Sequence, residues 1–370
     1  MSQKWQKYYV LTVLLVTILT LYFIKELTST KSLLSDYQHK INWSEYYESI
    51  FQNSHVKLLQ KSYPGVTCNT KNTTFIENMD IVASYKFNVS SKYLQDLSLD
   101  QSGVDRLSTP LTQPAKYPTF VTAASSNHYK ESIAMINNYH RLLGVHPDLK
   151  MIYFDIGLSA QQHSEMKEYC KCEMQTFDFG KYPKHVANLK AYTWKPIIIQ
   201  TVLKDHDFVL WMDASIRFIG KPLDMLFRLA RQRGLQFFPG GGAVMQRTSE
   251  ITFKFLNETP CMFNFPEAEA TTFVISRNRF TMEYFMKPLV LCALSWNCMT
   301  YQNSNADLHC PGKRKVHDCH RFDQTMMGIL TTRLFREKRR LVQFDLKPVH
   351  TVKRGTQGTI NKSPPTIKKG

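Results

Sequence analysis

The sequence predicts an α/β protein with a mostly parallel central sheet flanked by helices. The clearest observation is residues 208–212, five apolar residues that run straight into Asp213. A short apolar run bounded by polar residues is typical of a strand buried on both faces, as in parallel sheets. Residues 191–203, just before it, have helical spacing of apolar side chains. Strands and helices alternate in this way from residue 119 onward, which indicates right-handed strand-helix-strand units.

The predicted elements begin at 119–124, where a strand follows prolines that mark a linker. Each later unit pairs an apolar run of strand length with a segment of helical periodicity. Before the linker, 45–59 is expected to be a helix. In chain order we then expect helix 129–143, strand 150–155, helix 159–169, strand 172–179, helix 191–203, strand 208–212, helix 222–233, short strands 234–238 and 271–276, and helices 280–294 and 323–335.

The N-terminal end predicts a membrane anchor. Residues 8–24 carry no charge, and lysines flank them on both sides. A helix of this length rises about 25 Å, close to the thickness of the hydrocarbon core. Bulky residues stand where a signal peptidase needs small ones, so we expect the anchor to stay uncleaved. The expected organisation is a cytoplasmic tail at 1–7, the transmembrane anchor at 8–24, a lumenal stem and lead-in at 25–116, one α/β domain at 117–351 and a loose basic tail at 352–370.

Cysteines and glycosylation signals fit a lumenal, oxidising compartment. All eight cysteines lie beyond the predicted anchor, and we expect disulfides, with the four cysteines from 292 to 319 bonded among themselves. The open alternative is a zinc site at Cys310, His317, Cys319 and His320, although this spacing matches no paired-knuckle pattern. Asn-x-Ser/Thr signals stand at Asn42, Asn72, Asn88, Asn257 and Asn361.

The positive charge gathers late in the chain. The net charge is +17, and residues 313–370 hold 15 Lys and Arg against four Asp and Glu. Basic surface in the secretory pathway can face a donor diphosphate, an anionic glycan or acidic lipid head groups, or it can be a solvated tail. The anchor, and the lack of an interleaved aromatic ladder, argue against nucleic acid as a partner.

Asp213 and Ser215 are the first candidate site residues. A carboxylate and a hydroxyl two residues apart on one turn can face the same pocket at the carboxyl end of a strand. Mg²⁺ and Mn²⁺ prefer such hard oxygen ligands, together with substrate phosphates. Lys195 and Arg217 flank the strand and could neutralise a diphosphate. The open alternative is that Asp213 only forms the turn.

Two further groups of residues are candidates for binding and catalysis. Thr122, Ala123 and Ser125 lie at the end of the first strand, where small residues let a nucleotide approach the backbone. The alternative there is an ordinary helix cap. Glu269, just before a predicted strand, could bind the acceptor as an acid or base, or it could simply be solvated.

Four segments resemble an uncharacterised family of secretory-pathway proteins prominent in nematodes and molluscs, over about residues 117–335. More distantly, the layout is similar to GT-A fold glycosyltransferases, notably the glycogenin-like ones. The segments that carry the resemblance are 120–128 (FVTAASSNH), 192–203 (YTWKPIIIQTVL), 209–218 (VLWMDASIRF) and 319–325 (CHRFDQT).

The resemblance implies roles for matching residues. An Asp-x-Asp motif ends the central strand of the glycogenin-like enzymes, a later Asp-Gln pair lines the donor sugar, and a late His completes the metal site. These fall on Asp213 with Ser215, on Asp323 with Gln324, and on His350. Ser215 departs from the motif, so metal dependence is open. Asp323 could instead cap a helix, and His350 could be structural.

The function implied is a type II membrane glycosyltransferase of the Golgi or endoplasmic reticulum. It would move a sugar from a nucleotide-sugar donor to a glycan, lipid or protein, with Mn²⁺ or Mg²⁺ as a possible cofactor. The alternative is an inactive GT-A-like protein that binds glycans or acts as a scaffold, which the serine at position 215 favours. A plain adhesion ectodomain is disfavoured by the alternating α/β order.

Overall fold

The computed structural model describes residues 43–53, 55–69, 72–221, 223–304, 310, 319–344 and 348–360. The predicted tail and anchor at 1–24 lie outside these residues, as do Asn42, His317 and Asn361. Among the helices described, none is both long and apolar enough to cross a bilayer. The anchor therefore stays a prediction.

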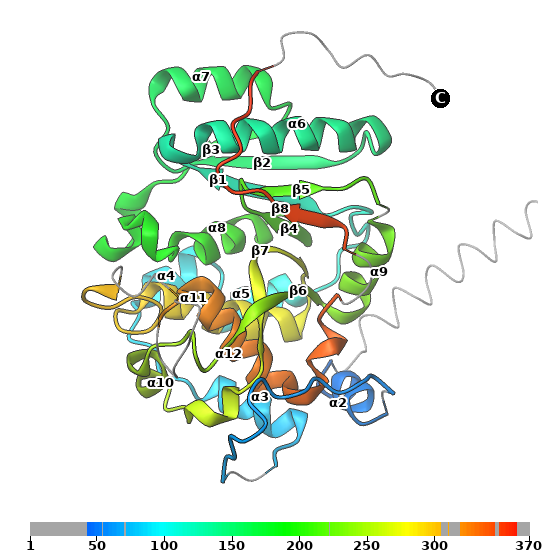
Figure 1. Cartoon of the computed structure of the whole chain (residues 1–370), viewed down its shortest axis with the longest axis vertical. Helices are drawn as coiled ribbons and strands as arrows, with labels where there is room; N and C mark the ends of the chain where they lie inside the picture. Colours follow the sequence, from blue (N-terminus) through cyan, green and yellow to red (C-terminus); the bar gives the residue numbers. More distant parts are fainter. Residues whose placement is uncertain are drawn as a thin grey trace, which may run out of the picture.

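A six-stranded sheet forms the centre of the molecule, in the order β3-β2-β1-β4-β7-β6 (Figure 1). The strands from β3 to β4 are parallel, whereas β7 runs antiparallel to both of its neighbours. The predicted α/β class with a mostly parallel sheet is therefore confirmed. The strands are β1 (Thr119–Ala124), β2 (Lys150–Asp155), β3 (Glu173–Thr176), β4 (Phe208–Met212), β6 (Leu235–Ala243) and β7 (Pro266–Ser276).

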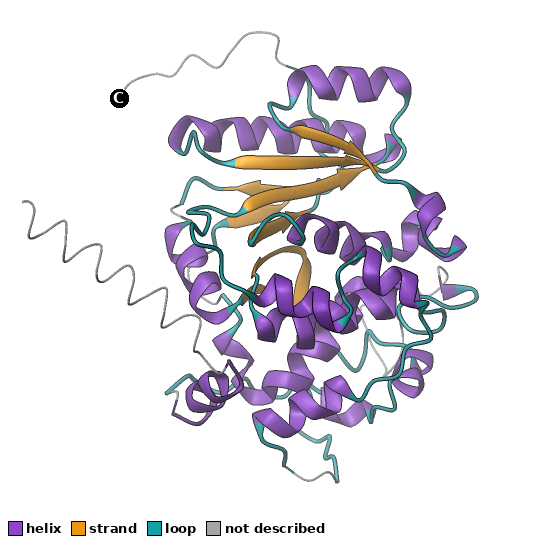
Figure 2. Ribbon diagram, turned by 180° about the vertical axis from the view of Figure 1, so that it is seen from behind, coloured by secondary structure: helices purple, strands orange, loops and turns teal. Residues whose placement is uncertain are grey.

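Helices cover both faces of this sheet, which Figure 2 shows from behind. The helices that follow the first strand are α6 (Tyr129–Val145), α7 (Ala160–Tyr169), α8 (Trp194–Leu203), α9 (Asp224–Arg233), α10 (Glu250–Phe255), α11 (Lys287–Leu294) and α12 (Asp323–Phe335). A capping box of Ser159 and Gln162 starts α7. A π-helical turn, Thr281–Met286, leads into α11, so the predicted helix at 280–294 is present with a wider first turn.

Each face of the sheet buries its own hydrophobic core. Along β4, Val209 and Trp211 belong to one core, whereas Phe208 and Leu210 belong to the other. Side chains alternate in this way because successive residues of a strand point to opposite faces. Helices α8, α11 and α12 contribute to the first core, and α6, α7 and α9 contribute to the second. Both faces of β4 are therefore covered, as the continuous apolar run predicts.

Helices from the predicted stem and lead-in pack against the α/β body, in blue and cyan in Figure 1. Phe75 and Met79, one helical turn apart, lie in the same core as Trp211. Cys68 is disulfide-bonded to Cys261. Residues from 43 onward thus take part in the folded unit. The helices are α2 (Trp43–Asn53), which ends before the predicted residue 59, α3 (Phe75–Ala83), α4 (Ser91–Asp96) and α5 (Gln101–Ser108).

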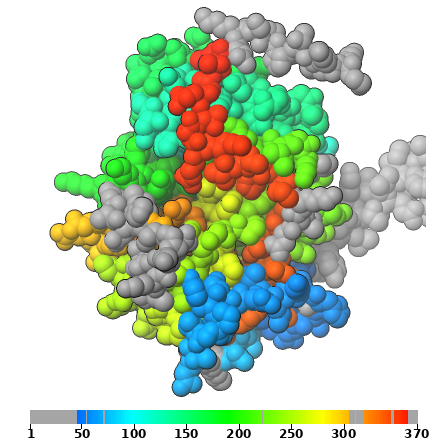
Figure 3. All heavy atoms as spheres, in the orientation of Figure 1, coloured from blue at the N-terminus to red at the C-terminus, as the bar shows by residue number. Residues whose placement is uncertain are grey.

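The C-terminal segment packs beside the first half of the α/β body, next to β5 (Ile216–Phe218) and α6. Strand β8 (His350–Val352) pairs antiparallel with β5, the short strand after β4. The chain then crosses α6, where the Gly358 amide donates to the Lys130 carbonyl at 2.8 Å. Figure 3 shows this red segment on the surface of the upper half. The described part of the predicted loose tail is therefore held against the body.

All eight cysteines form disulfides. Cys292 bonds Cys298 and Cys310 bonds Cys319, which confirms the predicted bonding within this group. The zinc alternative is wrong, because both of its cysteines are consumed in one disulfide. The remaining pairs are Cys68–Cys261 and Cys170–Cys172.

The disulfides differ in the loop that each closes, and this predicts unequal contributions to stability. Cys68–Cys261 spans 193 residues and Cys170–Cys172 spans two. In the chain-entropy account, replacing both cysteines of the long-range pair by serine should lower the free energy of unfolding by about 5 kcal/mol. Replacing both cysteines of the short pair should lower it by about 1.5 kcal/mol. Denaturant unfolding of the two double variants measures this. Equal losses would show that the segment around Cys68 is held by its packing alone.

Candidate active site

The order in which strands join the sheet changes direction between β1 and β4. From β1 the chain adds β2 and β3 on one side, then returns to place β4 on the other. The carboxyl ends of β1 and β4 flank the crevice in which open α/β sheets bind ligands. A pocket lies there. Ala123 and Ser125 line it from β1, Asp213 and Ser215 from the turn after β4, and Arg354 from the C-terminal segment.

Asp213 is held in a fixed position at the end of β4. Its amide donates to the Thr271 carbonyl at 2.8 Å, and its carboxylate accepts from the Trp211 indole at 2.8 Å. The Lys195 ammonium lies 3.1 Å from the same carboxylate oxygen. A quarter of the Asp213 side chain is exposed. Asp213 also accepts from the Ile216 amide in the turn. It is therefore both a turn former and a charged group oriented at a pocket.

Lys195 bridges two carboxylates beneath the pocket. Its ammonium lies 2.6 Å from Asp323 as well as 3.1 Å from Asp213, and only 3% of its side chain is exposed. It also donates to the Ala270 carbonyl of β7 at 3.2 Å. Burial lowers the pKa of Lys195, but the two carboxylates raise it by more, so its pKa lies above the ordinary value. Lys195, which the sequence analysis predicted to neutralise a diphosphate, is thus already paired with two carboxylates.

Asp323 and Gln324 begin α12, as predicted, but face different partners. Asp323 is buried, which raises its pKa, although the Lys195 ammonium opposes the rise. Gln324 hydrogen-bonds Glu267, a buried carboxylate on β7 that forms an ion pair with Arg247 at 2.7 Å. Asp323 thus belongs to the ion pair with Lys195, whereas the Gln324 amide contacts the ion pair of Glu267 and Arg247.

The glycines of β6 explain how the second ion pair fits. A Cβ at Gly242 would collide with Arg247 and Glu267, and one at Gly240 would press on Glu267. A side chain at Gly242 would force the Arg247–Glu267 ion pair to move, so glycine is favoured at this close approach. The predicted strand at 234–238 accordingly extends through the glycines to Ala243.

Glu269 and His350 lie together rather than apart. The His350 Nε2 atom lies 3.1 Å from the Glu269 carboxylate, and the Phe238 ring packs on the imidazole with centroids 4.4 Å apart. His350 is buried, whereas about a quarter of the Glu269 side chain is exposed. Glu269 therefore keeps a positioned, partly exposed carboxylate, although neither it nor His350 is among the residues that line the pocket.

These contacts do not fit the predicted metal ligand set. Asp213 is engaged with Lys195 and Trp211, Ser215 is buried, and His350 is engaged with Glu269. Within the described part of the chain, no group of three His, Cys, Asp or Glu side chains is placed to hold a metal ion. We therefore assign no chemical step to a metal.

The other predicted binding residues are divided between the pocket and its support. Ala123 and Ser125 line the pocket, and the Ser125 hydroxyl donates to Asn127 at 2.5 Å. Thr122 is fully buried beneath them in β1. Arg217 donates to the carbonyls of Ala214, Ile216 and Glu131 at 2.6, 2.7 and 3.0 Å. It therefore clamps the turn after Asp213 onto α6.

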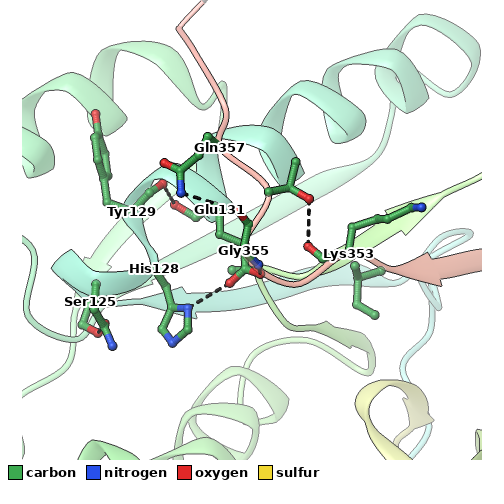
Figure 4. A network of polar contacts seen from close by, with 12 residues as sticks. Ser125, His128, Tyr129, Glu131, Lys353, Gly355 and Gln357 are labelled. Atoms are coloured by element: carbon green, nitrogen blue, oxygen red, sulfur yellow. Dashed lines mark hydrogen bonds and ion pairs between the residues drawn. The ribbon is translucent and has the colours of Figure 1, made fainter.

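Arg354 is a pocket residue that the sequence analysis missed. It follows β8, is exposed, and lines the pocket together with Tyr192. Glu131, which is buried, holds this segment: one carboxylate oxygen accepts from the Gly355 amide at 2.8 Å, and the other lies 2.8 Å from His128 (Figure 4). The only sequence signal for Arg354 was the late excess of positive charge.

Comparisons with known proteins leave the function open. Residues 61–200 match the model of a family described as "Protein of unknown function (DUF1647)". This stretch includes Lys195 but ends before Asp213 and the C-terminal segment. No curated protein matches the sequence.

Solved structures of glycosyltransferases are among those to which the chain is similar. The apo WbbM bifunctional glycosyltransferase is 13% identical, with a TM-score of 0.35 over 60% of this chain and 38% of that one. GlyE from Streptococcus pneumoniae TIGR4 is 12% identical, with a TM-score of 0.32 over 58% and 43%. The mannosyltransferase Ktr4p of S. cerevisiae with GDP is 9% identical, with a TM-score of 0.38 over 71% and 84%. The chain spans less than half of the first two.

Removing the Lys195 charge should destabilise the protein. In Lys195→Met, Asp323 is left buried without its cation, which should lower the free energy of unfolding by about 3–5 kcal/mol. The raised pKa of Lys195 means that its contribution is fully present below pH 10.5 and is lost as the pH rises through the folded pKa. Denaturant unfolding at pH 7 measures the loss. Lys150→Met, at the exposed first residue of β2, is the control.

Adding Asp323→Asn to Lys195→Met should recover part of the loss, because the uncompensated charge is gone. A Lys195→Met variant as stable as the control would contradict the bridging role.

Proposed function

We propose that this chain is a glycosyltransferase on a GT-A-like fold, which moves a sugar from a nucleotide-sugar donor to a hydroxyl group of a glycan, lipid or protein. One observation carries the proposal: the fixed carboxylate of Asp213 and the cation of Arg354 line the same pocket at the β1/β4 boundary. A nucleoside diphosphate needs a cation beside its phosphates. The sequence resemblance to glycogenin-like enzymes points to the same strand end.

The donor would lie across the ends of β1 and β4. Ala123 and Ser125 are small enough for a base and ribose to approach the backbone, and Tyr192 offers an aromatic wall. Arg354 reaches the same pocket from the other side. A guanidinium fork matches two phosphate oxygens, which is why arginine is favoured for this contact.

In the transfer step, the bond between the anomeric carbon and the diphosphate oxygen breaks, and the acceptor oxygen bonds to that carbon. The electron pair of the broken bond remains on the diphosphate, where Arg354 offsets the added charge. The acceptor hydroxyl gives its proton to a carboxylate, for which we propose Glu269, held by His350. Asp323 is a positioning residue that acts on Asp213 through Lys195.

A second candidate function is glycan binding or scaffolding without transfer. Two observations favour it: Ser215 replaces the second acid of the expected motif, and Asp213 is already engaged by Lys195. Such a protein could still bind a nucleotide sugar, but it would not turn it over. Donor hydrolysis or transfer separates the two functions.

Ligand binding to the full-length protein in detergent tests the proposal. UDP, GDP and their sugars should be screened by thermal shift and calorimetry, with and without Mn²⁺, and at least one should stabilise the protein. Arg354→Gln should raise the Kd for that nucleotide about 10–100-fold, as expected for a charge-assisted contact. Lys353→Gln is the matched control, because the neighbouring lysine side chain points away from Glu131 (Figure 4).

Asp213→Asn should reduce turnover of the donor at least about 100-fold while the protein stays folded, since it removes the carboxylate that would stabilise positive charge developing on the anomeric carbon, and removes little packing. Failure of every nucleotide to bind would overturn the proposal. Binding that is indifferent to Arg354 would move the donor site elsewhere.

We also propose that the protein is a type II membrane protein with its folded body in the lumen of the Golgi or endoplasmic reticulum. Four disulfides suit an oxidising compartment. The asparagines of the three described glycosylation signals, Asn72, Asn88 and Asn257, are exposed. The uncharged N-terminal run supplies the predicted anchor.

Expression in eukaryotic cells checks this topology. We expect glycans on Asn72, Asn88 and Asn257. Changing any one of them to Gln should reduce the mass that an endoglycosidase removes by the mass of one glycan. The protein should also stay with membranes after alkaline extraction. An unglycosylated, extractable product would contradict the lumenal placement.

A further inference from the structure

A second pocket lies beside the first, across one short segment. Residues 184–191 form two consecutive 3-10 turns. Leu189 and Tyr192 line the pocket at the β1/β4 boundary, whereas His185 and Asn188 line the second pocket. The two pockets therefore share a wall.

The far wall of the second pocket is the loop that follows α11. Trp296 is half exposed, at 49%, whereas Trp194 and Trp211 are buried at 5% and 1%. Among the described residues that line the pocket, none is Asp, Glu, Lys or Arg. The lining from this loop is Trp296, Thr300, Tyr301, Gln302, Asn303 and Ser304.

The indole of Trp296 projects from a rigid frame. Cys292 and Cys298 form a disulfide around it, and the Asn297 amide donates to the Thr300 carbonyl at 2.8 Å. His185 lies 2.9 Å from the Ala293 carbonyl through Nε2, and its ring packs against the indole with centroids 5.6 Å apart. The aromatic face is thus held at the surface before any ligand arrives, which reduces the entropy lost on binding.

The chemistry of this lining suits a neutral sugar. A large aromatic face gains free energy by covering an apolar surface, such as the C–H face of a pyranose ring. The exposed amide side chains of Gln302 and Asn303 can each donate and accept hydrogen bonds, which matches ring hydroxyls. The absence of charged side chains among the described lining residues disfavours a phosphate or a uronic acid.

We propose that the pocket of His185, Asn188, Trp296, Tyr301 and Gln302 binds a neutral pyranose residue, with the sugar ring stacked on Trp296. The binding itself stands independently of the transfer reaction. Its role as the acceptor subsite rests on the proposed glycosyltransferase function: a glycan seated here would cross the shared wall and present its next sugar to the pocket that contains Asp213.

The test is binding of defined neutral oligosaccharides to the full-length protein. Chitotriose, mannotriose, cellotriose and lactose serve as probes, read out by saturation-transfer NMR and by tryptophan fluorescence. At least one should bind, with C–H protons of one ring face receiving the saturation. Trp296→Ala should weaken this binding at least tenfold, and Trp296→Phe should restore part of it. Val145→Ala, at an exposed apolar residue far from the loop in sequence, is the control and should bind as the wild type does.

The outcomes separate this proposal from the one before it. Oligosaccharide binding that needs Trp296, in a protein that binds no nucleotide, would keep the sugar site and remove the transferase. If a nucleotide binds and oligosaccharide binding is unchanged in Trp296→Ala, the transferase proposal is kept and the sugar site is removed. The sugar site is also overturned when none of the four probes binds the wild-type protein.

Discussion

The Lys195 ammonium is the interaction on which the carboxyl edge of the sheet depends. It joins the end of β4 through Asp213, the start of α12 through Asp323 and the backbone of β7 through the Ala270 carbonyl. The buried charges of Lys195 and Asp323 are tolerated only because each has a partner at hydrogen-bond distance, since desolvation otherwise exceeds the Coulomb attraction. The geometry of the site is therefore constrained as a unit.

This constraint also assigns different roles to the charged residues. Lys195 is paired with two carboxylates, and Arg217 donates to three carbonyls. Arg354, in contrast, is exposed at the pocket, and Glu131 fixes the segment that carries it. The cations available to a ligand are thus Arg354 from the C-terminal segment and Lys190 from the turn before α8, which also lines the pocket, whereas the cations next to the central strand hold the frame. A chain without its last residues would keep the sheet and lose this arginine.

Local sequence patterns predicted the sheet well because their physical causes are local. The apolar run of β4 is buried on both faces, and Asp213 stands at its end as expected. Contacts between distant segments were not accessible in this way. Nothing near Lys195 in the sequence indicates Asp323, and nothing near Glu269 indicates His350. Arg354 was missed because a Gly- and Lys-rich composition predicts a loose tail. In the structure, the Gly358 amide bonds to the Lys130 carbonyl of α6 and holds this segment. Phe75 and Met79 lie one helical turn apart in the folded unit, but the polar composition of residues 25–116 led to their prediction as part of a stem.

Hydrogen exchange of the full-length protein, with and without the nucleotide sugar that binds most tightly, tests the central claim most directly. If the donor lies at the β1/β4 boundary, backbone amides should be protected at 123–128, at 213–217 and at 353–356. These stretches come from three distant parts of the chain and meet only in the folded pocket. Protection at 108–116 with 276–278, which line a separate pocket, or no protection at all, would contradict the claim.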